Sequence, residues 1–480
     1  MIPKFFKHSS FITHHSSFKK IAVVVMLFLT LDIGYFVDRQ DFTHFFIVYS
    51  SLFAVYFWVL KTAKTEDDFS FWLKTALILR GCLIFAMPNF SDDIYRFIWD
   101  GRLINMGINP FDFKPIYYFE NKLYTDVLTP ELYQFLNSKN YHTVYPSVCQ
   151  AFFSFAVWIF PKNIYGATLV IKSLLCLADI GSIFLIKKLL LNEGFDGRLN
   201  GRLNGRLKSP AIDAQYARHN THDAIRNTLL YALNPLIIIE LCQNIHFEGV
   251  AIFFFLLAIF FVQKNKTVVG SIAFSLSIAT KILPLMFLPF FLKNLGWRKA
   301  IAYYLMIGIF TLLLFLPLYN ATFLPNLKSS LDLYNKKFEF NASIYYLVRE
   351  VGFWLKGYNW GQFTTPYLNA IVLISIGFLF LKQKKSETFN LESFFTNCLF
   401  AYSIYCLCAA TVHPWYAAFG LFFSVFTKFR HPSVWTYFIG LTYIHYSYST
   451  YCENYWVIAL EYLIVVGLAV YELRNVKRFT

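Results

Sequence analysis

Long apolar stretches recur along almost the whole chain, and this recurrence limits the possible folds more than any other sequence feature. A helix crosses a bilayer core with about 20 mostly apolar residues, within a range of roughly 17–25. Stretches that meet or approach this length are 21–37, 43–60, 71–89, 165–191, 227–245, 249–263, 299–318, 366–382, 392–411, 414–428, 433–448 and 454–472. The chain is therefore expected to be an all-α polytopic membrane protein.

Two further apolar stretches are ambiguous. Residues 147–160 are bracketed by Pro146 and Pro161 and are short, so they are expected to lie in the membrane interface. Residues 267–292 are interrupted by Lys281 and Pro284, which predicts two half-helices that meet near one membrane face. With the second stretch crossing twice, we expect about 14 crossings, within a range of roughly 11–14.

Composition supports this class. Hydrophobic residues make up 57% of the 480 residues and charged residues only 15%, whereas about a quarter of the residues in an ordinary soluble domain are charged. These values exclude a disordered chain, a coiled coil, a collagen-like fibre and a string of soluble domains. We expect a single integral-membrane domain over residues 1–480.

Basic residues set the expected orientation. The formal net charge is +15, but the lysines and arginines occur in short clusters between apolar stretches, for example Lys19 with Lys20 and Lys264 with Lys266. Cytoplasmic loops carry this excess of positive charge. With the N-terminus inside, the clusters and the 192–226 loop all fall inside, while loops 90–146 and 319–365 fall outside. This distribution argues against a nucleic-acid partner.

The loop 192–226 contains a literal repeat. Gly-Arg-Leu-Asn occurs at 197–200 and again at 201–204, and Gly-Arg-Leu-Lys follows at 205–208. A period of four residues matches no solenoid unit. We expect a solvated, flexible cytoplasmic insertion whose arginines reinforce the inside assignment.

The densest polar cluster follows the predicted span 71–89, at residues 91–102. In a helix, Arg96 lies four residues from both Asp92 and Asp100, so charges alternate along one face. Ser91 could cap this helix, and acidic residues in its first turn suit the helix dipole. A carboxylate here could equally act as a general base, and the arginines could hold a phosphate. Spacing alone leaves both interpretations open.

The sequence of this cluster resembles a motif of a known protein family. Asp93-x-Tyr95-Arg96-x-x-Trp99-Asp100-Gly101, followed by Gly107-x-Asn109-Pro110, is similar to the first outer loop of GT-C membrane glycosyltransferases, and most of all to bacterial polyprenyl-phosphate-mannose-dependent mannosyltransferases. Further segments agree in order: Tyr145-Pro146, Asn234-Pro235 with Glu240 and His246-Phe247-Glu248, Lys281-Ile282-Leu283-Pro284, and His413-Pro414-Trp415-Tyr416. The chain departs from the family in having two or three spans before the acidic loop, and in having Glu248 where Asp is commoner.

The resemblance implies a GT-C-like bundle in a bacterial inner membrane. The enzyme would move a sugar, with mannose favoured, from a polyprenyl-phosphate donor to a glycan or lipid acceptor on the outer face, with inversion. The general base would be Asp93, or otherwise Asp92. Cations that stabilise the phosphate would be Arg96, Arg102, Lys281 and His413. Residues that contact substrate would be Tyr95, Trp99, Asp100, Asn109, Tyr145, His246, Glu248, Trp415 and Tyr416. Neither a cofactor nor a metal ion is expected, and membrane lipid would surround the bundle.

Other interpretations of these residues are structural. Lys172 and Asp179 lie on one face of a span and predict an intramembrane charge pair that holds helices together, and Glu240 is expected to be a buried partner in the bundle. The rival functions are a secondary transporter or flippase for a lipid-linked substrate, and a glycan ligase or acyltransferase. A transporter would hold its ionisable residues near the midplane within repeats, whereas here they gather at one face. For an acyltransferase, the sequence offers only one weak candidate for a catalytic pair, His246 and Glu248.

Overall fold

The computed structural model describes residues 6–203, 222–336, 338–386 and 389–479. Regular secondary structure in these ranges is helical, apart from one isolated bridge between Phe340 and Thr411. The helices up to residue 203 are α1 (Phe6–Tyr35), α2 (Phe42–Thr62), α3 (Glu66–Leu83), α4 (Asp93–Asn105), α5 (Pro115–Glu120), α6 (Pro130–Gln134), α7 (Ser147–Ile159) and α8 (Ile164–Leu203).

The next described range, 222–336, begins with a helix over His222–Ala232. It is followed by α10 (Pro235–Ile237), the π-helix η1 (Ile238–Gln243), α11 (Glu248–Gln263), α12 (Thr267–Thr280), η2 (Leu283–Phe287), α13 (Pro289–Leu295), α14 (Trp297–Phe315), η3 (Leu316–Leu318), α15 (Phe323–Lys336), α16 (Ile344–Lys356), α17 (Gly361–Lys382), α18 (Leu391–Cys408), η4 (Pro414–Tyr416), α19 (Ala417–Val425), α20 (His431–Gly440), η5 (Leu441–Tyr446) and α21 (Tyr455–Phe479). The predicted all-α polytopic class is confirmed.

Fewer helices than predicted are long and apolar enough to cross a membrane. Within the described residues six qualify, or seven if the pair His222–Ala232 and Pro235–Gln243, bent by 46°, counts as one span. Four further apolar helices are shorter, with 10–17 residues. The sequence estimate of about 14 counted three of these short stretches as full crossings, while 147–160 was expected not to cross. Part of the difference arises because an apolar stretch is broken, as between Ala232 and Pro235, so that it becomes two short helices.

These breaks have local causes. Asn234 caps the short helix that Pro235 begins, with its side chain accepting hydrogen bonds from the amides of Leu236 and Ile237. At Lys281 the backbone is extended (φ −143°, ψ 131°), which ends α12, and Pro284 lies in the first turn of η2. The predicted division of 267–292 is confirmed. Non-helical backbone at membrane depth is tolerated where it lines a cavity.

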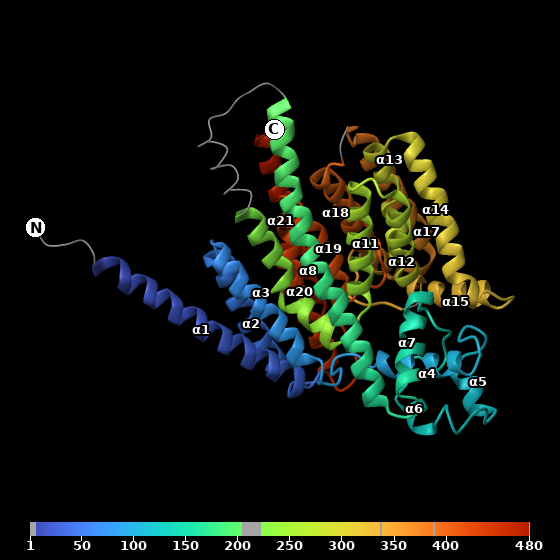
Figure 1. Cartoon of the computed structure of the whole chain (residues 1–480). Coiled ribbons are helices and arrows are strands. Elements are labelled where there is room, and N and C mark those ends of the chain that lie inside the picture. Colours follow the sequence, from blue (N-terminus) through green and yellow to red (C-terminus); the bar gives the residue numbers. More distant parts are fainter. Residues whose placement is uncertain (1–5, 204–221, 337, 387–388, 480) are drawn as a thin grey trace, which may run out of the picture.

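The helices form one bundle with different structures at its two ends. In Figure 1 the C-terminus and the far end of α8 lie at the top, whereas α4, α5 and α6 lie at the bottom and α15 lies above them, at the lower end of α14. The predicted topology requires this separation of loop 192–226 from loops 90–146 and 319–365. Helix α8 itself runs to Leu203, through the first Gly-Arg-Leu-Asn copy, so the insertion begins as helix rather than as flexible loop. Residues 204–221 lie outside the described residues.

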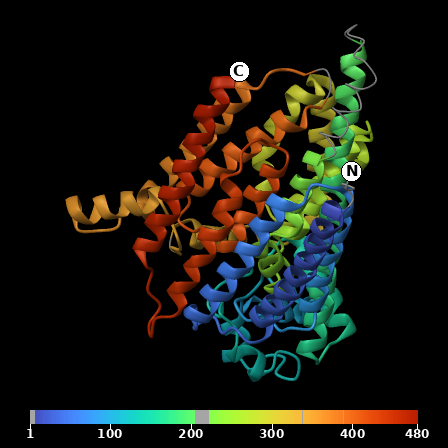
Figure 2. The same ribbon diagram turned by 90° about the vertical axis from the view of Figure 1, so that its left-hand side faces the viewer.

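A short helix projects from the side of the bundle. Figure 2 shows α16 extending laterally, roughly at right angles to the long helices. Its apolar side chains face outward: Trp354 is 84% exposed and Leu347 68% exposed. An amphipathic helix with this exposure is typical of the membrane interface, where the lipid would cover these side chains.

Charged side chains inside the bundle form hydrogen bonds or ion pairs, but with other partners than those predicted. Arg80 donates to Asp179 at 2.5 Å, and neither side chain is exposed. Tyr231 also donates to Asp179, at 2.7 Å. Lys172 instead donates to the carbonyl of Ala86 and, at 2.9 Å, to Gln243. The prediction that these charges join helices is correct for Asp179, but its cation comes from α3.

Candidate active site

A cavity of about 830 Å³ collects predicted site residues from segments far apart in the chain. Those that line it are Asp92, Asp93, Tyr145, His246, Glu248, Lys281, His413, Trp415 and Tyr416. They come from the N-terminal end of α4, the segment before α7, the turn before α11, the break after α12 and the segment around η4. Each segment is a point where a helix begins, ends or is interrupted.

The two neighbouring carboxylates have different partners. Both terminal nitrogens of Arg39 donate to one oxygen of Asp92 at 3.1 Å. Asp93 accepts a single side-chain bond, from the amide of Asn137 at 3.1 Å. Asp92 occupies the N-cap position of α4 but makes no side-chain capping bond. Asp92 therefore does not cap the helix through its side chain. Asp93 lies in the first turn of α4, where an acidic residue suits the helix dipole, and its amide donates a long bond to the Ser91 hydroxyl.

Lys281 lies at the break after α12 and forms an ion pair in the cavity. Its ammonium is 2.9 Å from one oxygen of Glu248, and its side chain is 27% exposed. The second oxygen of Glu248 is buried and has no hydrogen-bond partner within the described residues. Asp93 lies close enough to act electrostatically on Lys281. The acidic loop and the broken helix thus meet at one place.

Two histidines flank an indole ring. The ring of Trp415 stacks on His246 at 3.6 Å and on His413 at 4.3 Å between centroids. Nδ1 of His246 lies 3.1 Å from a carboxylate oxygen of Glu240, and Tyr443 donates to the other oxygen at 2.8 Å. This leaves Nε2 of His246 without a partner among the described residues. Glu240 is buried, as predicted, and orients a cavity residue.

The remaining predicted site residues are not among those that line the cavity. Arg96 is buried and donates to Asp100 at 2.7 Å, and to the carbonyls of Ser138 and Tyr141 at 3.2 and 3.0 Å. Asp100 also accepts from Gln150 at 3.1 Å. These contacts fasten the 138–141 segment to α4. Arg96 and Asp100 bond to other parts of the protein because the face of α4 that carries them is turned inward.

The other four residues away from the cavity also make structural contacts. Arg102 donates to the carbonyl of Val127 at 2.6 Å, and the amide of Asn109 donates to the carbonyl of Leu318 at 2.6 Å. Trp99 is buried against aromatic neighbours, and Tyr95 stacks on Phe135 at 4.9 Å. These side chains shape the outer loop and connect it to the end of η3.

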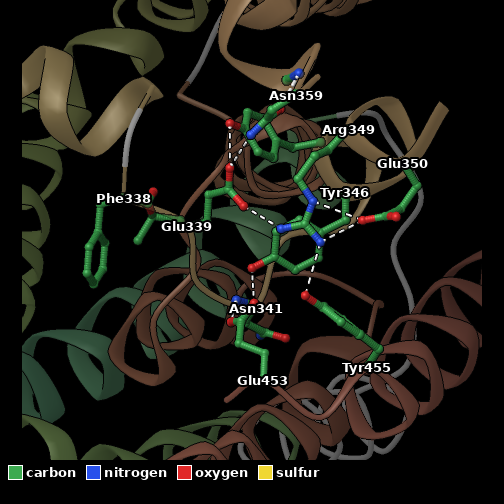
Figure 3. Close-up of polar contacts among 12 residues, drawn as sticks. Phe338, Glu339, Asn341, Tyr346, Arg349, Glu350, Asn359, Glu453 and Tyr455 are labelled. Carbon is green, nitrogen blue, oxygen red and sulfur yellow. Dashed lines mark hydrogen bonds and ion pairs between the residues drawn. The ribbon is translucent and has the colours of Figure 1, made fainter. Parts of the chain in front are cut away.

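A polar cluster supports the wall behind His413. The ring of Phe340 lies 4.7 Å from that of His413, and its backbone bonds to Ala410 and Val412 at 3.1 and 2.8 Å. Figure 3 shows Arg349 among Glu339, Glu350 and Tyr455, with Phe338 pointing away from them; Phe338 lines the cavity. The cluster therefore connects α16 to the cavity wall.

Part of the cavity lining is apolar. It includes Leu285 and Met286 of η2 and Val372, Leu373 and Ile376 of α17. Leu373 and Leu285 are 69% and 42% exposed. The cavity thus combines polar groups with apolar side chains that also reach the surface of the bundle.

Sequence reasoning missed several lining residues, above all Arg39, Asn137 and Tyr446. Arg39 lies in the short link between α1 and α2 and has its guanidinium 5.0 Å from the ring centre of Tyr446. One signal was available: Arg39 is a basic residue in a link that the predicted topology places outside, against the positive-inside tendency. Asn137 and Tyr446 carried no comparable signal.

Comparison with known proteins gives one match. Residues 211–296 match the sequence model of a family described as alpha-(1->6)-mannopyranosyltransferase, N-terminal domain. No curated protein and no solved structure matches the chain. The matched range includes His246, Glu248 and Lys281, and a mannosyltransferase family favours an enzyme over a transporter. The match agrees with the resemblance of the outer-loop motifs to GT-C membrane glycosyltransferases, and it supports a glycosyltransferase that acts on mannose.

Proposed function

We propose that the protein transfers mannose from a polyprenyl-phosphate donor to an acceptor hydroxyl, with inversion at the anomeric carbon and Asp93 as general base. One observation carries the proposal: a carboxylate, a lysine and two histidines from distant segments line one cavity that is also lined by apolar side chains of η2 and α17. A polyprenyl-phosphate sugar has the same division into polar head and apolar tail.

Asp93 is preferred to Asp92 because of their partners. Both terminal nitrogens of the Arg39 guanidinium donate to Asp92 at 3.1 Å, so this carboxylate is already held in an ion pair. Asp93 forms no ion pair within the described residues, and its side chain accepts one bond, from the neutral amide of Asn137. It can accept the proton of the acceptor hydroxyl as that oxygen attacks the anomeric carbon.

The leaving group is stabilised by cations. When the bond between the anomeric carbon and the phosphate oxygen breaks, its electron pair stays on the phosphate, which becomes a monoester. Lys281 and His246 are suited to this charge, since both line the cavity and Nε2 of His246 has no partner in the described structure. Arg96 and Arg102, predicted for this role, bind the protein elsewhere. His413, also predicted for this role, stacks on Trp415 and so helps to hold the indole ring beside His246.

The donor's tail would lie against the apolar side chains that η2 and α17 contribute to the cavity lining. Burial of hydrocarbon stabilises such a complex by about 0.8 kcal/mol per CH₂. The reaction would take place on the outer face of a bacterial inner membrane, as the family resemblance implies. Among the described residues, no group of three or more His, Cys, Asp or Glu side chains is arranged to hold a metal ion.

A transfer assay tests the proposal. Purified protein is supplied with polyprenyl-phosphate mannose, glucose or an aminosugar and a mannose oligosaccharide acceptor, and the anomeric configuration of the product is determined by NMR. We expect transfer from the mannose donor with inversion. Asp93→Asn should lower kcat by about 10²–10⁴, the usual contribution of general-base catalysis, whereas Asp92→Asn should have a much smaller effect. Full activity of Asp93→Asn would reject the assignment of the base.

A further inference from the structure

A second cavity, of about 560 Å³, lies between the outer loop and α15. One wall is the segment Asn140–His142, and the other includes Lys328, Ser329 and Ser330 of α15. Lys114 completes its polar lining on the loop side. The lining is thus rich in amide, hydroxyl and ammonium groups. None of the reaction steps described above uses it.

Both walls are fixed to the same framework. Arg96 holds the loop wall through the carbonyl of Tyr141 at 3.0 Å. On the other side, Ser330 donates to the carbonyl of His142 at 2.9 Å, and Asn326 donates to the carbonyl of Phe111 at 2.7 Å. The cavity is therefore preformed, since hydrogen bonds join its walls directly.

The two cavities share both of these walls. Asn137 lines the first cavity and donates to Asp93, while Asn140 begins the lining of the second. On α15, Leu331 lines the first cavity, whereas its neighbours Ser330 and Asp332 line the second. Three residues of extended chain span at most about 11 Å, so a flexible oligosaccharide could reach from one cavity into the other.

The chemistry of the second cavity suits a charged sugar chain. Lys114 and Lys328 have no ion-pair partner within the described part of the chain, and Asp332 is the one acidic side chain in the lining. Tyr141 presents a ring that is 44% exposed. Nδ1 of His142 is buried without a partner among the described residues. Burial and the charges of Lys114 and Arg96 lower the pKa of His142, so its neutral ring can bond a hydroxyl.

We propose that the second cavity binds the part of an anionic glycan acceptor that precedes the sugar being extended. This inference rests on the proposed function, because it places the acceptor's terminal hydroxyl beside Asp93. Lys114 and Lys328 bind a carboxylate or phosphate on the glycan, and Tyr141 and His142 contact its neutral sugars. The cavity thereby selects the acceptor, separately from the donor.

Binding without donor tests the inference. Asp93→Asn protein in detergent is titrated with a neutral mannose oligosaccharide, with the same oligosaccharide carrying a glucuronic acid, and with one carrying a phosphate. The double variant Lys114→Gln, Lys328→Gln should bind the charged probes about tenfold more weakly, at about 0.7 kcal/mol for each exposed ion contact, and the neutral probe with unchanged affinity. Lys122→Gln, an exposed lysine of the same loop that lies outside the lining, is the matched control.

The outcomes separate this inference from the proposed function. Unchanged affinity of the double variant for both charged probes would overturn the inference, as would an equal loss for neutral and charged probes. Preference for the carboxylated or the phosphorylated probe would support it and identify the anionic group. Failure of every polyprenyl-phosphate donor in the transfer assay would overturn the proposed function, while the binding result, obtained without donor, would stand. Equal melting temperatures of the variants exclude misfolding.

Discussion

The ion pair between Lys281 and Glu248 gives a quantitative test of where the donor phosphate binds. Lys281 is proposed to contact this phosphate, yet its ammonium already lies 2.9 Å from Glu248. Glu248 therefore repels the phosphate that Lys281 attracts. We expect that Lys281→Gln severely impairs transfer and that adding Glu248→Gln to this variant partly restores it.

The magnitudes follow from Coulomb's law. With an effective dielectric constant of about 20, a phosphate charge about 4 Å from Lys281 gains about 4 kcal/mol, and repulsion from Glu248 at about 7 Å costs about 2.4 kcal/mol. Lys281→Gln removes the attraction and leaves the repulsion, which predicts a loss of roughly 10³-fold in kcat/KM. The double variant removes both, and its loss of about 2 kcal/mol corresponds to roughly 20–30-fold. The double variant should therefore be roughly 50-fold more active than the single one, which corresponds to the repulsion of about 2.4 kcal/mol that it removes.

The assay is the initial rate of transfer against donor concentration for the wild type, both single variants and the double variant. Melting temperatures of all four proteins control for folding, because Glu248 is buried. A double variant no more active than Lys281→Gln, at equal melting temperature, would refute the placement of the phosphate beside this pair. A Glu248→Gln variant less active than the double variant would also refute it.

Three further predictions concern the framework of the site. Arg80→Met should lower the free energy of unfolding by about 3–5 kcal/mol, since it leaves the carboxylate of Asp179 buried and unpaired, and SDS titration of reconstituted protein measures this; a loss below about 1 kcal/mol would contradict the ion pair. The pKa of His142 is lowered, so its neutral ring contributes stability above about pH 6.5. This stability is lost as the pH falls further. Acidification to pH 5 should therefore lower the melting temperature of the wild type more than that of His142→Gln. Trp415→Ala removes two stacked pairs of about 0.5–1.5 kcal/mol each and should lower kcat/KM more than Trp415→Phe does, while Trp456→Ala, at a site 87% exposed, should leave it unchanged.

The fold class could be predicted from sequence because apolar length and charge distribution act locally. The break at Lys281 was also readable, since a lysine followed by Pro284 cannot continue an apolar helix. The number of full-length spans could not be predicted, because the sequence does not show whether two apolar stretches such as 222–232 and 235–243 join as one bent span. The partner of Asp179 was missed for a related reason: Arg80 is 99 residues away, and helix packing alone brings them together.

The site was predicted where motifs coincide with helix ends and not where they lie inside a helix. Asp92, Asp93, Lys281 and His413 all lie at such ends and line the cavity. The face of a helix that turns inward depends on what packs against it, so the sequence did not show that Arg96 points away from the cavity. Its charge and its spacing from Asp100 are equally compatible with both orientations.

The ion pairs of the cavity give a second reason to choose Asp93. Three basic side chains of the cavity lie beside carboxylates: Arg39 beside Asp92, Lys281 beside Glu248, and His246 beside Glu240 behind the lining. Pairing is expected at the edge of a membrane, where an isolated charge is poorly solvated. Asp93 forms no ion pair within the described residues, and its side chain accepts one hydrogen bond, from the neutral amide of Asn137. It is therefore the lining carboxylate that can contact an acceptor hydroxyl without first breaking an ion pair.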